Sequence, residues 1–99
     1  MGFKIFLDDI RKAPAGYQVC RTIRDCEMML SILRPIDVLS IDYDLGGGRT
    51  TMELLEHIAE KGYQIPHINI HSDHRDGVPL LWKYCEEHFP DTNITTNKA

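Results

Sequence analysis

The sequence lacks three features: a long hydrophobic run, an excess of positive charge and a paired set of cysteines. Hydrophobic residues make up 42% of the 99, but polar residues interrupt them throughout, so no segment is long enough to span a membrane. The net charge of −4 at pH 7 argues against a nucleic-acid duplex as partner, because binding its backbone needs clustered lysines and arginines. We therefore expect a soluble protein with neither a membrane nor a duplex partner.

The three cysteines, Cys20, Cys26 and Cys85, are odd in number and contain no Cys-x-x-Cys pair. This pattern disfavours a disulfide framework and a zinc ribbon, so we expect buried, reduced thiols. The N-terminus has no basic segment followed by a long apolar stretch, so no signal peptide is recognised and a cytoplasmic location is the default expectation. With 99 residues the chain has room for one small core, and residues 1–99 are expected to form a single domain.

Strand-like and helix-like segments alternate along the chain. Apolar, β-branched runs predict strands at 3–7, 37–42 and 67–71, and shorter runs indicate further strands at 17–20 and 93–96. Apolar residues at helical spacing predict three helices between these strands. The alternation is typical of a small doubly wound α/β fold of the flavodoxin or receiver type. We expect a parallel sheet of about five strands with about three helices, covered on both faces.

The helix boundaries have their own sequence signals. Thr22 with Asp25 and Thr50 with Glu53 have the spacing of capping boxes, which satisfy backbone N–H groups at a helix start. Gly62 is placed to end the second helix, because glycine readily adopts the left-handed conformation found there. The first helix is expected to stop before a proline and the third to stop at one.

Aspartates follow two of the predicted strands. Asp8 and Asp9 end the first strand, and Asp42 and Asp44 follow the strand at 37–42. Parallel α/β sheets bind ligands beyond the carboxyl ends of their strands, where these four acids would meet. Converging carboxylates repel one another, and a hard divalent cation relieves that repulsion, so the pattern predicts a metal site with Mg²⁺ as the expected ion. The plainer alternative is that one or two of these aspartates only cap turns or helices.

Ser72, which ends the strand at 67–71, completes an ordered set of residues. An acid pair after the first strand, an Asp after a later one and a hydroxyl after the next resemble the response-regulator receiver pattern. The resemblance implies that Asp8 and Asp9 hold Mg²⁺, that Asp42 accepts a phosphoryl group and that Ser72 contacts it.

Two departures from the receiver pattern follow from the residues. The stretch from Asp9 to Asp42 has room for one helix rather than two, so one receiver helix is expected to be missing. The receiver lysine should follow the last strand, where only Lys98 at the end of the chain is found. The phosphoacceptor role of Asp42 is therefore the weaker of two hypotheses.

Three sequence motifs resemble those of a second protein family. They are Phe6-Leu7-Asp8-Asp9-Ile10-Arg11, Asp42-Tyr43-Asp44-Leu45-Gly46 and Ile70-His71-Ser72. Together they closely resemble the cyclic-phosphate processing receiver domains, a degenerate receiver group. The resemblance implies a small ligand that contains a cyclic nucleotide or another cyclic phosphate.

Under this resemblance, Asp8, Asp9, Asp42 and Asp44 would hold one metal ion that activates water for attack on the phosphodiester. Asp42, His71 and Ser72 are the candidate catalytic residues, with His71 as the group that moves a proton. Arg11, Ser72 and His74 are the candidate ligand-binding residues, although Arg11 could equally be a surface cation beside the acids.

Two function classes remain open. The first is a metal-dependent enzyme or binding protein for a cyclic phosphate. The second is a non-catalytic signalling module that carries a phosphoryl group on Asp42, or binds a nucleotide or a protein partner without phosphorylation.

Overall fold

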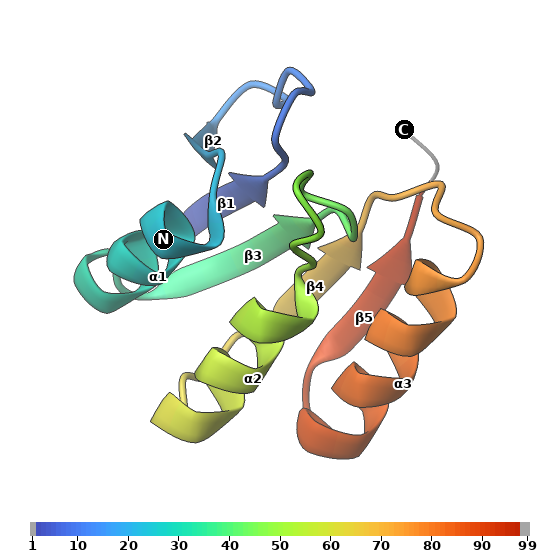
Figure 1. The fold of residues 1–99 in the computed structure, drawn as a ribbon. Coiled ribbons are helices and arrows are strands. Elements are labelled where there is room, and N and C mark those ends of the chain that lie inside the picture. Colours follow the sequence, from blue (N-terminus) through green and yellow to red (C-terminus); the bar gives the residue numbers. More distant parts are fainter. Residues whose placement is uncertain (1, 98–99) are drawn as a thin grey trace.

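Strands and helices alternate along residues 2–97, the part of the chain that this computed structural model describes (Figure 1). In chain order the elements are β1 (Phe3–Leu7), β2 (Tyr17–Cys20), α1 (Ile23–Ile32), β3 (Ile36–Ile41), α2 (Met52–Lys61), β4 (His67–Ile70), α3 (Gly77–His88) and β5 (Asn93–Thr96). The five predicted strands and three predicted helices are confirmed. Lys98, considered above as a receiver lysine, lies outside the described residues.

The five strands form one parallel sheet in the order β2-β1-β3-β4-β5. Every second side chain along a strand points to the same side of the sheet and into the core. Ile5 and Leu7 in β1, and Leu39 and Ile41 in β3, have no exposed surface. Because β1 and β3 are neighbours, the residues that follow them meet at the carboxyl edge of the sheet. The predicted α/β receiver-like fold is confirmed, with β5 as an edge strand.

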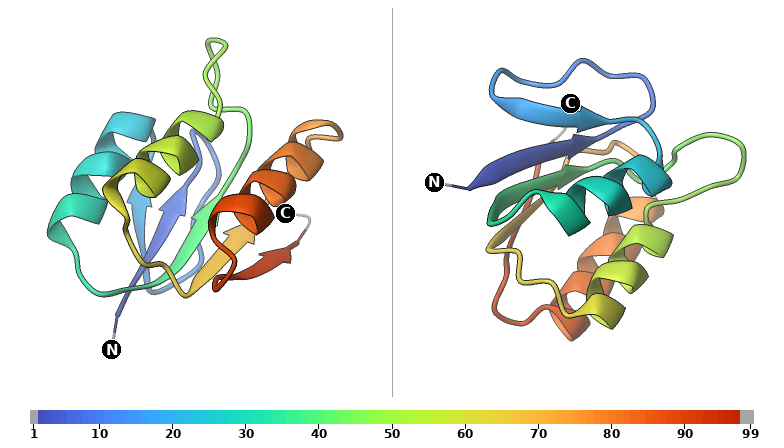
Figure 2. Two further views of the ribbon diagram at one scale, coloured as in Figure 1. Left: turned by 90° about the horizontal axis from the view of Figure 1, so that it is seen from below. Right: turned by 90° about the vertical axis from the view of Figure 1, so that its left-hand side faces the viewer.

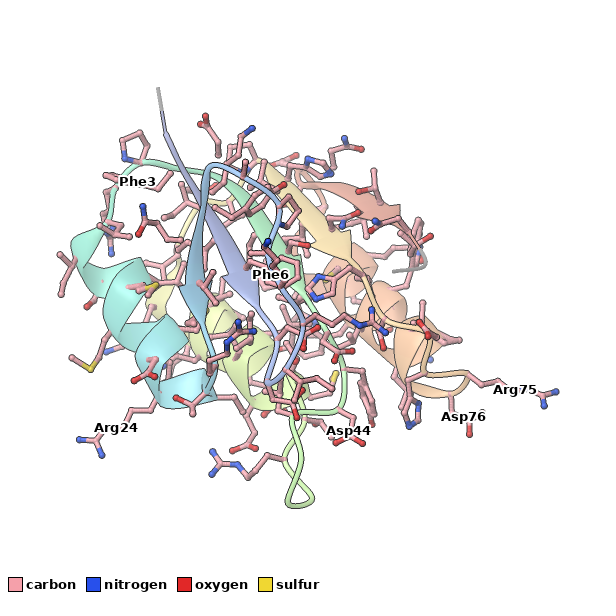
Figure 3. The ribbon with its side chains drawn as sticks, turned by 90° about the horizontal axis from the view of Figure 1, so that it is seen from above. Phe3, Phe6, Arg24, Asp44, Arg75 and Asp76 are labelled. Carbon is pink, nitrogen blue, oxygen red and sulfur yellow. The ribbon has the colours of Figure 1, made fainter. Side chains whose placement is uncertain are left out.

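All three helices within residues 2–97 lie on the same face of the sheet, which corrects the expectation that both faces are covered. The helices stand in front of the strands in the left view of Figure 2, and the strands stand in front of the helices in Figure 3, seen from the other side. Crossovers between parallel strands are almost always right-handed. The crossovers from β2 to β3, β3 to β4 and β4 to β5 all run in one direction across the sheet, so they place their helices on one face.

The β1–β2 connection runs in the opposite direction, and a right-handed crossover there would lie on the other face. In this chain that connection, residues 8–16, contains no helix. The shortened stretch between Asp9 and Asp42 therefore does remove a receiver helix, as predicted. No helix of residues 2–97 covers that face of the sheet.

The uncovered face carries polar side chains that hydrogen-bond to one another across the strands. His67 Nε2 lies 2.7 Å from Thr95 Oγ1, which donates to Asn69 Oδ1 at 2.8 Å. Asn69 Nδ2 in turn donates to Ser40 Oγ at 3.2 Å. Parallel sheets usually bury apolar side chains on both faces. Here the β3–β5 half of the open face instead carries a polar network, in which His67, Asn69 and Thr95 are partly exposed and Ser40 is buried.

The capping signals were partly correct. Thr22 caps α1, because its hydroxyl accepts a hydrogen bond from the Asp25 N–H at 3.1 Å. Gly62 ends α2 with φ +71°, the left-handed conformation that the sequence predicted.

The prediction that Thr50 and Glu53 form a capping box is wrong. Residue Thr51 directly precedes α2, and its hydroxyl donates to the backbone carbonyl of Asp42 instead of capping the helix. Glu53 pairs with Arg49, whose Nε lies 2.9 Å from Oε2. Thr51 is fully buried, so its hydroxyl ties the start of α2 to the end of β3.

The three cysteines are buried and unpaired, as expected. Within the described part of the chain, no helix combines the length and the apolar character needed to cross a membrane.

Candidate metal centre

Three of the four predicted acids converge at the carboxyl edge of the sheet. Asp8 and Asp9 directly follow β1 and Asp42 directly follows β3, and each offers one carboxylate oxygen within 4.8 Å of the others. Asp8 has no exposed surface, whereas Asp9 and Asp42 are half-buried. The parallel pairing of β1 with β3 produces this convergence. Three carboxylates at such distances have the oxygen donors that a hard divalent cation prefers.

Asp8 is held by three hydrogen bonds. Its Oδ1 accepts from the backbone N–H groups of Ile10 at 3.0 Å and Arg11 at 2.9 Å, and its Oδ2 lies 3.0 Å from His71 Nε2. Burial raises the pKa of Asp8, but the hydrogen bonds from Arg11, Ile10 and His71 outweigh it and the pKa is lowered. Asp8 is therefore a carboxylate near pH 7.

His71 is buried, with 2% of its surface exposed, and both ring nitrogens are engaged. Nε2 faces Asp8, and Nδ1 lies 2.7 Å from Ser40 Oγ. The ring stacks on Phe6 with centroids 4.2 Å apart. Burial lowers the pKa of His71 and outweighs the opposing effect of Asp8, so the ring is neutral near pH 7. The predicted proton transfer by His71 would require one of its two hydrogen bonds to open.

Asp44 does not join the other acids, contrary to the prediction that it is a metal ligand. It is exposed, and it lies in the 42–50 loop at the rim of the domain (Figure 3). Its Oδ1 accepts a hydrogen bond from the Gly46 N–H at 2.9 Å. Aspartate commonly stabilises a turn through the N–H two residues on. This contact is the turn-capping role that the alternative gave to one or two of the aspartates.

The same loop passes close to the acid cluster at Gly46. A Cβ at this position would lie 3.4 Å from Asp9 Oδ2, and the residue has φ +82°. Glycine adopts this conformation without strain. It therefore lets the backbone pass closely over Asp9.

Arg11 lies against the site and not simply at the surface. Its Nη1 donates to the backbone carbonyl of His71 at 3.0 Å, and its Nη2 lies 3.4 Å from Asp73. Its Nε is 4.0 Å from Asp8 Oδ2. The guanidinium thus joins the loop after β1 to the end of β4, and places positive charge next to the acids.

Ser72 and His74 follow β4, on the side of Asp42 away from β1. The Ser72 hydroxyl accepts from the His74 N–H at 3.1 Å, and its own proton remains available for donation. His74 Nδ1 accepts from the Gly77 N–H at 2.9 Å at the start of α3, and the ring packs 4.6 Å from that of Tyr43. A cavity of about 360 Å³ is lined by Ser72, His74 and the end of β5.

The comparison with protein-family models gives one match, to the cyclic-phosphate processing receiver domain, over residues 3–87. The match covers most of the chain. The chain belongs to the cyclic-phosphate processing receiver domain family. Searches of the curated proteins and of the solved structures found no match.

The matched region of this cyclic-phosphate processing receiver domain contains the three clustered acids and His71, Ser72 and His74. Sequence reasoning missed two residues next to them. Ser40 contacts His71, and its signal was a polar residue between the apolar Leu39 and Ile41 of a strand. Arg21 donates to the backbone carbonyl of Asp8 at 3.0 Å, and nothing in its sequence surroundings indicated this contact.

Proposed function

We propose that this receiver domain binds one divalent cation, with Mg²⁺ as the expected ion, at Asp8, Asp9 and Asp42. With the cation in place, the site binds a cyclic nucleotide or related cyclic phosphate and hydrolyses it. The observation that carries the proposal is the convergence of three carboxylate oxygens within 4.8 Å, in a chain of this family.

The residues present fit such a cation. Mg²⁺ is usually held by one or two carboxylates and keeps several positions for water and phosphate oxygens. Asp8 is ionised and fixed in the protein, while the half-buried Asp9 and Asp42 can adjust to the ion. When bound, a divalent cation polarises a phosphodiester oxygen and lowers the pKa of a coordinated water.

The neighbouring donors support a phosphate ligand. The Ser72 hydroxyl and the free Nε2 of His74 lie beside the cavity of about 360 Å³, which offers space for the organic part of a small ligand. Arg11 supplies positive charge on the same side, through a guanidinium held by the His71 carbonyl. We assign Ser72, His74 and Arg11 to binding and orientation of phosphate oxygens. The predicted catalytic roles of Asp42, His71 and Ser72 stay predictions.

Turnover is the direct test. The protein is incubated with Mg²⁺ and a panel of 3′,5′- and 2′,3′-cyclic nucleotides, and ring opening is followed by phosphorus NMR. We expect hydrolysis of at least one member of the panel, its loss with EDTA, and its loss in Asp42→Asn. The matched control is Asp44→Asn, which removes an exposed acid outside the cluster and should retain activity. Equal activity of the two variants would contradict the proposal.

The phosphoacceptor hypothesis is separated by a second incubation, with acetyl phosphate and Mg²⁺. A stable acyl-phosphate on Asp42, without turnover of any cyclic nucleotide, would establish the signalling module in place of the enzyme. We expect no such adduct in the intact protein by mass spectrometry.

A further inference from the structure

We propose that Ser40 and Asn69 are positioning residues of the metal centre, which fix the tautomer of His71 and through it the orientation of the Asp8 carboxylate. The inference rests on the proposed function only for its last step, the binding of a cation by Asp8. Neither Ser40 nor Asn69 has a charge or touches the acid cluster, so their role is exerted through His71.

A continuous row of hydrogen bonds connects the open face of the sheet to Asp8. Asn69 Nδ2 donates to Ser40 Oγ at 3.2 Å, Ser40 Oγ lies 2.7 Å from His71 Nδ1, and His71 Nε2 lies 3.0 Å from Asp8 Oδ2. Parallel pairing brings these groups together, because Ser40 of β3 lies beside Asn69 of β4 in the strand register. Ser40, His71 and Asp8 are all buried, with 3%, 2% and no exposed surface.

The protons in this row can be placed by counting donors. The Asp8 carboxylate already accepts from two backbone N–H groups, so it faces His71 as an acceptor and requires a proton on Nε2. A neutral ring then has a lone pair on Nδ1, which must accept the proton of the Ser40 hydroxyl. Asn69 Nδ2 donates to one lone pair of Ser40 Oγ and thereby leaves the hydroxyl proton directed at His71.

The opposite tautomer is disfavoured by the same contacts. A proton on Nδ1 would leave the lone pair of Nε2 facing the carboxylate of Asp8 at 3.0 Å. Two acceptors at that distance repel, and a buried polar atom without a partner costs about 1–3 kcal/mol. Within residues 2–97, no buried side-chain nitrogen or oxygen lacks a partner, so the row is fully satisfied in one arrangement.

Packing holds the ring in the plane that this arrangement needs. Phe6 stacks on the His71 ring with an interplanar angle of 6°, and Figure 3 shows Phe6 on the open face of β1. The ring therefore cannot turn away from Asp8 without losing the stacking contact. A fixed Nε2–H occupies one lone pair of Asp8 Oδ2 and leaves the other for the cation. Outer-shell partners of this kind commonly contribute 10- to 100-fold to metal affinity.

The test compares variants of the complete chain by two readouts. Nitrogen-15 NMR of the His71 ring reports the tautomer without metal, and calorimetric titration with MgCl₂ reports affinity. We expect the Nε2–H tautomer in the wild type, and a mixture of tautomers with about tenfold weaker Mg²⁺ binding in Ser40→Ala. Ser40→Thr keeps the hydroxyl and should restore both readouts. Asn69→Asp replaces the donor to Ser40 by an acceptor, so it should draw the Ser40 proton away and behave like Ser40→Ala.

The matched control is Val38→Ala, which shortens a side chain on the same face of β3 without touching His71. It should leave the tautomer and the Mg²⁺ affinity unchanged. An Nδ1–H tautomer in the wild type, or equal losses in Ser40→Ala and Val38→Ala, would overturn this inference. A wild type with the Nε2–H tautomer that binds no Mg²⁺ would overturn the proposed function, and with it the last step of the inference.

Discussion

At the scale of single residues, Asp8 and Asp9 show how adjacent acids acquire different tasks. Asp8 is buried and receives three hydrogen bonds, whereas Asp9 is half-buried and close to Gly46. The first carboxylate therefore belongs to the architecture of the carboxyl edge as well as to the acid cluster. The second belongs mainly to the acid cluster. Stability measurements can separate these tasks.

We predict that Asp8→Ala lowers the free energy of unfolding by about 2–3 kcal/mol. The substitution leaves two backbone N–H groups and the His71 ring without an acceptor, and hydrogen bonds to charged groups are worth about 1.5–3 kcal/mol. Asp9→Ala should change stability by less than about 1 kcal/mol. Urea denaturation of both variants without metal provides the comparison. Equal losses would mean that the hydrogen bonds of Asp8 do not stabilise the fold.

The pH dependence of stability should reflect His71. Its pKa in the folded protein lies below the ordinary value of 6.5, mainly because burial disfavours the charged ring. The unfolded chain therefore takes up this proton first as the pH falls. Its contribution to stability is complete above pH 6.5 and is lost as the pH falls through that value towards the folded-state pKa. Metal-free urea midpoints should drop from pH 7.5 to 5.5 in the wild type and drop less in His71→Gln. Parallel curves would contradict this.

The sequence predicted the residues of the site better than their arrangement. The convergence of Asp8, Asp9 and Asp42 could be predicted, because an apolar run that stops at acids marks the end of a strand. Asp44 could not be excluded as a ligand from the sequence, since a position two residues after Asp42 fits a metal ligand as well as a turn. In the structure, Asp44 lies outside the acid cluster and accepts a hydrogen bond from the Gly46 N–H.

At the scale of elements, the boundaries of α2 illustrate which signals are reliable. Gly62 was predicted correctly because a left-handed residue at a helix end strongly favours glycine. The start of α2 was misplaced by one residue, because two successive threonines can both act as caps. The helix begins after Thr51, whose hydroxyl donates to the Asp42 carbonyl at the end of β3. This hydrogen bond connects two elements, so no local sequence signal predicts it.

Gly62→Ala should lower the free energy of unfolding by about 1 kcal/mol. A Cβ there meets no atom within 4 Å, so the whole cost comes from φ +71°. Lys61→Ala, one residue earlier in the same helix, is the control and should change stability by less than about 0.5 kcal/mol. Thermal or urea unfolding measures both. A neutral Gly62→Ala would show that this helix end does not need its left-handed residue.

The position of the helices on one face is also an element-scale result. The short stretch between Asp9 and Asp42 predicted the missing helix, whereas the sheet was expected to be covered on both faces. The handedness of crossovers explains the single covered face, since only the β1–β2 connection runs towards the edge occupied by β2. The polar contacts of Ser40, Asn69 and Thr95 on the open face agree with this arrangement.

At the scale of the whole molecule, strand order determines the layout of the site. The carboxyl ends of β1 and β3, which hold the acids, lie at the centre of the sheet, and the end of β4 with Ser72 lies beside them. The cavity beside Ser72 reaches the end of β5. The proposed phosphate ligand, bound at the acids, would therefore have donors and space on the same side. The family match covers β1 to α3 and stops before β5.

The central claim is that Asp8, Asp9 and Asp42 form one cation site, and thermal unfolding with and without Mg²⁺ tests it most directly. A ligand that binds only the folded state stabilises it by about 2.7 kcal/mol at one hundred times its Kd. We expect saturating Mg²⁺ to raise the Tm of the wild type and of Asp44→Asn by several degrees, and to leave the Tm of Asp9→Asn unchanged. A wild-type Tm that does not respond to Mg²⁺, or an equal response in Asp9→Asn, would contradict the account.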